Sequence, residues 1–307
     1  MQADQTVIVT GGAGFIGSHL VDALVERVKR VVVIDKRKVS KAWKNAKATY
    51  KVSDIRDASF GEWVQKYKPG TIFHLAAHID DRESVHEPAM NADNNIIGSL
   101  NVFEAARKHG VKKVLFASTG VVYGQQGTVP IAIDAQTHPM TPYAISKLTA
   151  EQYLRFYRSV YDLSFAALRL GNVYGPRQDG SVECGAIAIF SSRFLAGDQV
   201  YVNNDGKTTR DYVHVSDVVQ AFLLAAGSDT SGVYNVGTGE GTETLKLYEL
   251  VQDAVGVHAQ PNWREDIQDE LKHVSLDASL TTKDFGWAPQ IMIEQGVQDT
   301  VNWYRDR

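Results

Sequence analysis

The sequence predicts an α/β protein with a doubly wound parallel sheet, and three observations support this fold class. Short runs rich in β-branched residues recur in the first half without strict polar alternation, which is typical of strands covered on both faces. Segments with helical periodicity separate these runs. A glycine-rich turn joins the first run to the first helical segment. A smaller lobe, interleaved with the sheet domain, is expected in the second half.

The elements follow in order along the chain. Strands are predicted at residues 6–10, 31–35, 71–76 and 113–118, with helices around 15–27, 57–67 and 89–109. A further helix should begin at Pro142, because proline suits the first helical position and Thr141 suits the N-cap. The run at 164–170 then predicts another buried strand.

The local composition of the sequence changes near residue 172, where glycine and proline become frequent. We expect a sheet domain over residues 1–171 and a smaller lobe over most of residues 172–307. A segment near 211–240 should return to the sheet, and within it residues 211–226 resemble a strand and helix of the main sheet. The two parts are therefore predicted to be interleaved.

The composition excludes several classes of function. The 307 residues carry a formal charge of −4 with scattered Lys and Arg, so no nucleic acid or anionic membrane partner is expected. The single Cys184 excludes an internal disulfide and a cysteine-rich zinc site, and no histidine spacing matches a metal motif. No apolar run could span a bilayer, and we recognise no signal peptide, so a cytoplasmic protein is the expectation.

The glycine-rich turn, TGGAGFIG, has the context of a dinucleotide-binding loop. Gly11, Gly14 and Gly17 permit a tight turn, close approach of a pyrophosphate and close helix packing. The helix N-terminus adds N–H groups and partial positive charge. Asp35 ends the second strand, where its carboxylate can accept hydrogen bonds from an adenosine ribose, although the neighbouring Lys36 and Arg37 could attract a 2′-phosphate. The pattern favours a Rossmann domain that binds NAD.

Tyr143 and Lys147, in TPYAISK, stand one helical turn apart on the same face. In isolation the pair is typical of many solvated helices. A nearby ammonium can lower a phenol's pKa from ~10 by roughly one to three units, which would make the tyrosine a useful acid/base group. The remaining motifs decide between these interpretations.

The order of motifs along nearly the whole chain resembles that of extended short-chain dehydrogenases/reductases, and in particular the UDP-glucose 4-epimerase group. The matching segments are TGGAGFIG, SDIRD, FHLAA, NNIIGSLNVFEAAR, ASTGVVYG, YAISK, LRLGNVYGPRQ, ECGAIAIF and GKTTRDYVHVSDV. The resemblance implies NAD-dependent epimerisation of a UDP-sugar at C4 through a 4-keto intermediate, with UDP-glucose and UDP-galactose as the main substrates. It also implies a homodimer formed through the helices near 89–109 and 143–160.

The resemblance assigns roles to individual residues. Tyr143 would be the general acid/base, Lys147 would tune it and hold the nicotinamide ribose, and Thr119 would orient the sugar 4-hydroxyl. The cofactor would contact Gly11, Gly14, Phe15, Ile16, Gly17, Asp35, Lys36, Asp54, Ile55, Leu75, Ala76, Ala77, Asn95, Ser118, Tyr143 and Lys147. The substrate would contact Thr119, Tyr143, Asn172, Ala186, Ile187, Asn203, Arg210, Arg264 and Val274.

Two of these substrate residues bear on specificity. Val274 stands where a bulky tyrosine closes the sugar pocket of the family to N-acetylated substrates, so UDP-N-acetyl sugars are also predicted to enter. Arg264 is displaced by three residues from the family's usual arginine, which leaves its contact with the phosphate open.

Other functions remain as alternatives. A nucleotide-sugar dehydratase or decarboxylase of the same fold would carry acids where this chain has Gly120 and Val121. A UDP-glucuronate epimerase, a one-way reductase and a non-catalytic NAD-binding protein are further alternatives. The joint presence of Thr119, Tyr143 and Lys147 argues against the last of these.

Overall fold

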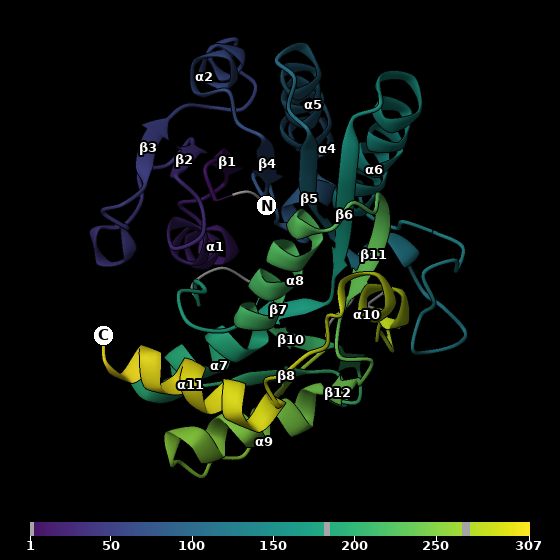
Figure 1. The fold of residues 1–307 in the computed structure, drawn as a ribbon. Helices are drawn as coiled ribbons and strands as arrows, with labels where there is room; N and C mark the ends of the chain where they lie inside the picture. The colour runs from purple at the N-terminus through teal and green to yellow at the C-terminus, as the bar shows by residue number, and fades with distance from the viewer. Residues whose placement is uncertain (1–2, 181–184, 266–270) are drawn as a thin grey trace.

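A seven-stranded parallel sheet forms the larger part of the molecule in a computed structural model that describes residues 3–180, 185–265 and 271–307 (Figure 1). The strand order is β11-β6-β5-β4-β1-β2-β3, and the predicted fold class is confirmed. The strands are β1 (Thr6–Thr10), β2 (Arg30–Asp35), β3 (Thr49–Val52), β4 (Thr71–His74), β5 (Lys113–Thr119), β6 (Ser164–Leu170) and β11 (Gly232–Val236).

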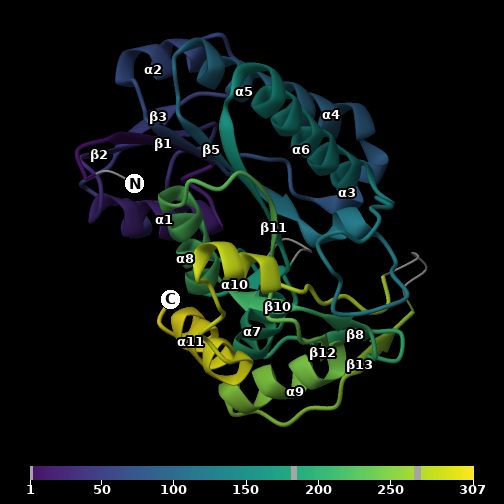
Figure 2. The same ribbon diagram turned by 45° about the vertical axis from the view of Figure 1, so that its right-hand side comes forward.

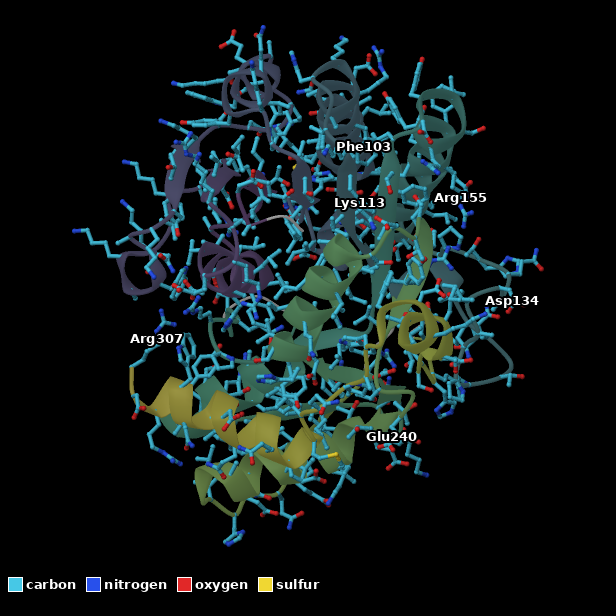
Figure 3. The ribbon with its side chains drawn as sticks, viewed as in Figure 1. Phe103, Lys113, Asp134, Arg155, Glu240 and Arg307 are labelled. Carbon is cyan, nitrogen blue, oxygen red and sulfur yellow. The ribbon has the colours of Figure 1, made fainter. Side chains whose placement is uncertain are left out.

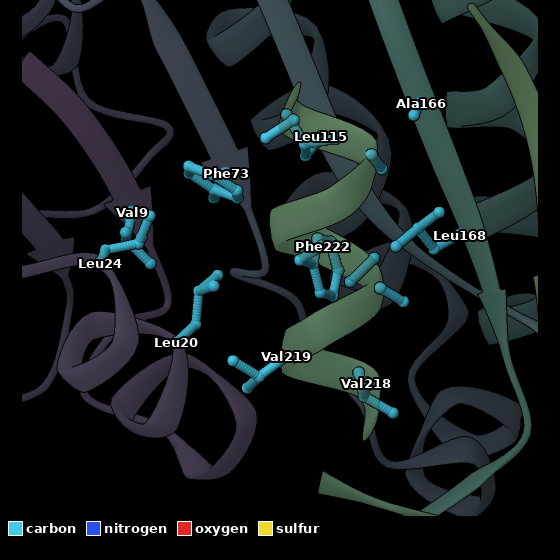
Figure 4. Packing of buried hydrophobic residues seen from close by; sticks show 14 of the residues in the cluster. Val9, Leu20, Leu24, Phe73, Leu115, Ala166, Leu168, Val218, Val219 and Phe222 are labelled. Atoms are coloured by element: carbon cyan, nitrogen blue, oxygen red, sulfur yellow. The ribbon is translucent and has the colours of Figure 1, made fainter. Parts of the chain in front are cut away.

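Helices cover both faces of the sheet, because alternate residues of its strands point to opposite sides. Val7 and Val9 of β1 face a core shared with α1 (Phe15–Val25) and α8 (Val215–Gly227), and Figure 4 shows Val9 on the side of the sheet where these helices lie. Ile8 faces the other core, formed with α2 (Ser59–Tyr67), α5 (Gly98–Lys108) and α6 (Pro142–Tyr161). The continuous apolar runs of the sequence are thereby explained.

The strand order reverses between β1 and β4, since the chain builds the sheet outward from β1 in both directions. Ligands of open parallel sheets bind beyond the carboxyl ends of the strands at such a reversal. The segments after β1, β4, β5 and β6 therefore converge on one edge of the sheet.

Two predicted elements differ in detail, and two further elements were not predicted. The strand expected at 71–76 ends at His74. The helix expected at 89–109 consists of α4 (Pro88–Ala92), a π-helical turn (Asp93–Ile97) and α5. The strand β3, which the sequence did not single out, forms one edge of the sheet. A short α3 (Asp81–His86) precedes α4.

The smaller lobe lies below the sheet in Figure 1 and holds its own apolar core between α7 (Ala186–Ala196), α9 (Thr244–Val255) and α11 (Ile293–Arg305). Its strands pair in twos: β7 (Asn172–Tyr174) with β10 (Tyr212–His214), β8 (Tyr201–Asn203) with β13 (Asn262–Arg264), and β9 (Thr209–Arg210) with β12 (Thr242–Glu243). The helix α10 (Ser279–Phe285) packs against β11.

The segment 211–226 was predicted to return to the main sheet as a strand and a helix. The helix packs against the sheet, but the strand does not join it. The strand β10 pairs with β7 in a separate two-stranded sheet. The helix α8 returns across the sheet beside α1, and β11 then joins the sheet next to β6 (Figure 2). The division near residue 171 stays a prediction. None of the helices that the structure describes is long and apolar enough to cross a membrane.

Candidate active site

The glycine-rich turn packs as the sequence predicted. Gly11 has a positive φ of 73°, and a Cβ there would lie 2.6 Å from the backbone nitrogen of Ala76. A Cβ on Gly17 would lie 2.2 Å from the carbonyl oxygen of Gly11. Gly14 is the N-cap of α1 and has no neighbour closer than 3.3 Å to its Cβ position. The turn is therefore closed on its protein side, while the helix start, with Phe15 and Ile16, can receive an anionic group.

Asp35 is held at the end of β2 by two backbone donors. One carboxylate oxygen accepts from the N–H of Ala13 at 3.0 Å, and the other accepts from the N–H of Arg37 at 2.9 Å. Lys36 and Arg37 are both exposed, and a guanidinium nitrogen of Arg37 lies 3.5 Å from the Cβ position of Gly14. Arg37 thus reaches the start of α1, a placement that its position in the sequence did not reveal.

The segment after β4 is fixed to the glycine-rich turn and to α6. The N–H of Ala76 donates to Thr10 Oγ1, and the N–H of Leu75 donates to the Thr10 carbonyl. The side chain of Asn95 accepts from the N–H of His78 at 2.7 Å and donates to the His78 carbonyl at 2.9 Å. It also donates to Ser146 Oγ on α6. Asn95 therefore positions the backbone beyond Ala77.

The SDIRD segment after β3 lies against the π-helical turn. Asp54 forms an ion pair with Arg56 at 2.8 Å, and hydrogen bonds from Arg56 lower the pKa of the Asp54 carboxyl. Arg56 also pairs with Asp93. Ile55 is buried beside Gly98, so the SDIRD segment is fixed against the π-helical turn and the start of α5, while its contact with the cofactor stays a prediction.

The helix α6 begins as the sequence predicts. Pro142 is its first residue, and Thr141 Oγ1 accepts from the N–H of Ala144 at 3.2 Å. Lys147 is buried, and its Nζ donates to the carbonyl of Ala117 at 2.8 Å. Burial lowers the pKa of Lys147 to about 7, while the Glu151 carboxylate acts in the opposite direction.

Thr119 is brought to the same place by β5. It is the last residue of that strand, two positions after Ala117, and its Oγ1 accepts from the N–H of Val121 at 3.3 Å. Its hydroxyl hydrogen is not used in that bond. The three predicted catalytic residues thus converge at the end of β5 and the start of α6.

The sequence interpretation missed a buried ion pair beneath these residues. Glu151, one turn after Lys147, accepts from Arg169 of β6 through both carboxylate oxygens, at 3.1 and 2.7 Å. Ser118 Oγ also donates to Glu151. The repeated four-residue spacing of Tyr143, Lys147 and Glu151 on one helical face was the available signal.

The predicted substrate residues lie at several places in the smaller lobe. Asn172 begins β7, and Arg210 in β9 donates to the carbonyl of Thr209. Asn203 and Arg264 are register partners in the β8–β13 pair, and Arg264 Nε donates to Asn203 Oδ1 at 3.2 Å. The displaced arginine therefore contacts Asn203, another of the predicted substrate residues.

The remaining substrate candidates face apolar cores. Ala186 and Ile187 open α7, and Ile187 is fully buried in the core of the smaller lobe. Val274 is 6% exposed and packs among Val122, Tyr123, Ile131 and Leu276. Glu183 and Cys184, from the ECGAIAIF segment, lie outside the described residues. Within the described ranges, no cluster of three or more His, Cys, Asp or Glu side chains could hold a metal ion.

Known proteins are similar to this chain in both sequence and fold. The family model for NAD dependent epimerases/dehydratases matches residues 7–237. A UDP-glucose 4-epimerase from Mycolicibacterium smegmatis is 39% identical over 308 residues, with 98% of each chain covered. The fold is similar to that of UDP-glucose 4-epimerase from Thermotoga maritima with UDP-glucose, at a TM-score of 0.95 and 39% identity over 98% of this chain and 99% of that one. It is also similar to UDP-N-acetylglucosamine 4-epimerase from Methanobrevibacter ruminantium in complex with UDP-N-acetylmuramic acid, at a TM-score of 0.94 and 33% identity over 100% and 99%.

Proposed function

The chain belongs to the NAD-dependent epimerase/dehydratase family, and we propose that it is an isomerase that inverts C4 of a UDP-sugar, with UDP-glucose and UDP-galactose as its main substrates. One observation supports this most directly. Lys147, one turn from Tyr143, donates a hydrogen bond to the strand that ends in Thr119, at the same carboxyl edge of the sheet as a glycine-rich turn suited to a dinucleotide. The cofactor is NAD.

The residues present fit this cofactor. The tight glycine-rich turn and the start of α1 suit the pyrophosphate, and the carboxylate of Asp35 suits the adenosine ribose. When bound, NAD supplies a reversible acceptor for the hydrogen at sugar C4. Lys147 would hold the nicotinamide ribose, and Asn95 would keep the segment beyond β4 in place.

Acid/base chemistry falls to the end of β5 and the start of α6. Tyr143 takes the proton of the sugar 4-hydroxyl as C4 is oxidised to a ketone, and it returns the proton when C4 is reduced on its other face. The hydroxyl of Thr119 orients the same oxygen. Lys147, when protonated, stabilises the tyrosinate through its charge. Asn172 and Arg210 are proposed to bind the diphosphate, since a planar guanidinium suits that group.

The alternatives fit less well. Gly120 and Val121, which follow Thr119, supply no acid/base group for elimination or decarboxylation. Acceptance of UDP-N-acetyl sugars is part of the proposal, on account of the small Val274. A UDP-glucuronate epimerase differs only in the group at sugar C5, so it is kept as an outcome of the test.

A homodimer is also proposed. Large apolar side chains are exposed on the outer faces of the π-helical turn and α6: Ile97, Ile145, Tyr153, Phe156, Val160 and Tyr161. Such a patch on neighbouring helices suits burial against a second copy of the chain. A cytoplasmic location stays a prediction.

The function is tested by incubating the purified protein with single UDP-sugars and no added cofactor. UDP-glucose, UDP-galactose, their N-acetyl counterparts and UDP-glucuronate are each followed by chromatography. We expect an equilibrium mixture of the two C4 epimers of the accepted sugars, without net formation of NADH. Accumulation of NADH would indicate a one-way dehydrogenase, and loss of water or carbon dioxide would indicate a dehydratase or decarboxylase.

A further inference from the structure

A row of polar side chains crosses the carboxyl edge of the sheet beneath the candidate active site. Ser118 of β5 and Arg169 of β6 are register partners, and Arg169 is also the register partner of Asn235 in β11. All three are buried. Glu151 of α6 lies over this row and is fully buried, with Ser118 and Arg169 as its donors.

Lys147 and Glu151 form hydrogen bonds with consecutive residues of β5. The Nζ of Lys147 donates to the carbonyl of Ala117, and Glu151 accepts from the side chain of Ser118. The next residue is Thr119. Two neighbouring turns of α6 are therefore tied to the two residues that precede the catalytic hydroxyl, which fixes the helix against the strand end.

A contribution to folding stability does not by itself explain why Glu151 and Arg169 form a buried ion pair. Removing two charges from water offsets much of their mutual attraction, and well-packed apolar replacements of buried ion pairs are often neutral or stabilising. Arg169 also has a second contact, because its guanidinium lies 4.7 Å from the ring centre of Tyr123. The carboxylate of Glu151 is the group whose charge bears on a catalytic residue.

We propose that Glu151 is a positioning residue for the proposed epimerase reaction: its buried carboxylate keeps Lys147 protonated beside Tyr143 and locks both to the end of β5. The proposal rests on the proposed function for its role in catalysis. The effect of the Glu151 charge on the protonation of Lys147 depends only on residues of this chain.

The other ionisable groups around Lys147 do not replace Glu151. Tyr143 stands on the same helix, and the buried His74 of β4 is neutral, since burial lowers its pKa to about 3. Arg169 of β6 has the wrong charge. Asp81 of α3 accepts from Thr141 at the start of α6, and burial raises the pKa of its carboxyl. Of the carboxylates on the elements packed against Lys147, only Glu151 opposes the effect of burial on this lysine.

Loss of the Glu151 charge should therefore lower the pKa of Lys147 further, because the one group that opposes the effect of burial is removed. Glu151 lies one turn from Lys147 and two turns from Tyr143, so its charge acts mainly on the lysine. Without it, Lys147 gives up its proton at lower pH and leaves Tyr143 without an ammonium neighbour. Tyrosinate should then form at higher pH.

The test is Glu151→Gln, read out by the tyrosinate absorbance of Tyr143 in protein without substrate. The chain has 13 tyrosines, so the signal of Tyr143 is isolated by subtracting the titration of a matched Tyr143→Phe protein, once with Glu151 and once with Gln at position 151. We expect the Tyr143 titration to move upward by about one pH unit or more, which corresponds to ~10-fold in the ionisation constant. The kcat near pH 7 should fall at least tenfold and recover toward higher pH, with KM little changed.

Two further variants keep the result interpretable. Asp217→Asn removes another buried carboxylate, on α8, and should leave the Tyr143 titration unchanged. If Glu151→Gln does not fold, Glu151→Gln with Arg169→Met removes the unpaired buried cation and should show the same upward shift. An unchanged Tyr143 titration in the folded variant overturns the proposal, as does an equal shift in Asp217→Asn. Absence of epimerase activity in the wild type would instead refute the proposed function.

Discussion

The Nζ atom of Lys147 lies 5.8 Å from the ring centre of Tyr143, one turn along α6. This places the lysine within electrostatic reach of the phenol. Tyr143→Phe keeps the ring and removes the acid/base group, so kcat should fall by ~100- to 10,000-fold. Turnover of UDP-galactose measures the effect, and the far-UV circular dichroism spectrum should not change. Near-normal turnover in the folded variant would remove Tyr143 from the mechanism.

Asp35 should determine the choice of dinucleotide. In Asp35→Asn, one of the N–H groups of Ala13 and Arg37 loses its acceptor, and the ribose loses a carboxylate. We expect roughly tenfold or greater weakening of NAD binding, with less discrimination against NADP. Calorimetric titration of cofactor-stripped protein measures both. Lys47→Gln, which alters an exposed residue between β2 and β3, is the control and should bind NAD normally.

Val274→Tyr should close the sugar pocket to N-acetyl groups. The kcat/KM for UDP-N-acetylgalactosamine is expected to fall much more than that for UDP-galactose. Because Val274 is buried, the larger side chain should also lower the free energy of unfolding by ~1–3 kcal/mol. Ile131→Phe enlarges another residue of the same cluster and controls for that strain. Equal loss of both activities, or no N-acetyl turnover in the wild type, contradicts the prediction.

Phe156→Glu should weaken the proposed dimer. The side chain is 46% exposed on α6 amid other apolar residues, so a charge there would have to be buried by a partner. A hot-spot loss of ~2 kcal/mol corresponds to a roughly 30-fold higher dissociation constant. Analytical ultracentrifugation measures this constant. Glu240→Lys, an exposed charge change on the smaller lobe labelled in Figure 3, should leave it unchanged.

Lys113 should stabilise the end of α8. The Nζ of Lys113, a residue labelled in Figure 3, donates to the carbonyls of Ala225, Ser228 and Thr230 at 2.6–2.9 Å. Lys113→Met leaves these acceptors unsatisfied and should lower the free energy of unfolding by ~1–3 kcal/mol. Urea denaturation measures the change.

The same lysine predicts a pH dependence. Burial lowers the pKa of Lys113 to about 8, whereas the unfolded chain keeps the proton to about pH 10. Between these values the unfolded state binds more protons, so the free energy of unfolding rises with pH. The wild type should therefore gain stability relative to Lys113→Met between pH 8 and 10. A constant difference would mean that Lys113 titrates normally in the folded state.

Local patterns in the sequence predicted most of the sheet, because the apolar runs of the central strands need no knowledge of their partners. The edge strand β3, with the sequence TYKV, was missed because an edge strand needs less apolar surface and all of its residues stay partly accessible. The assignment of 212–214 to the main sheet was wrong because three residues cannot indicate which neighbour they pair with.

In the active site, too, the features defined by local spacing were predicted, and those that depend on contacts between distant segments were not. Tyr143, Lys147 and the glycine-rich turn were found because short-range spacing defines them. Glu151 and Arg169 were missed because a glutamate and an arginine, 18 residues apart, are typical of a solvated surface. Their burial follows from the register of β5 with β6 and from the position of α6, and neither is visible in a linear sequence.

The placement of α8 and β11 has a consequence for how the protein is made. Val218, Val219 and Phe222 of α8 cover an apolar face of the sheet whose residues on β1, α1 and β4, such as Val9, Leu20 and Phe73, all lie before residue 171. A ribosome-bound chain that has emerged only to residue 171 would expose that apolar face of the sheet to water. Folding of the cofactor domain must therefore wait until about residue 236 has left the exit tunnel, and nascent chains shorter than this should depend on chaperones.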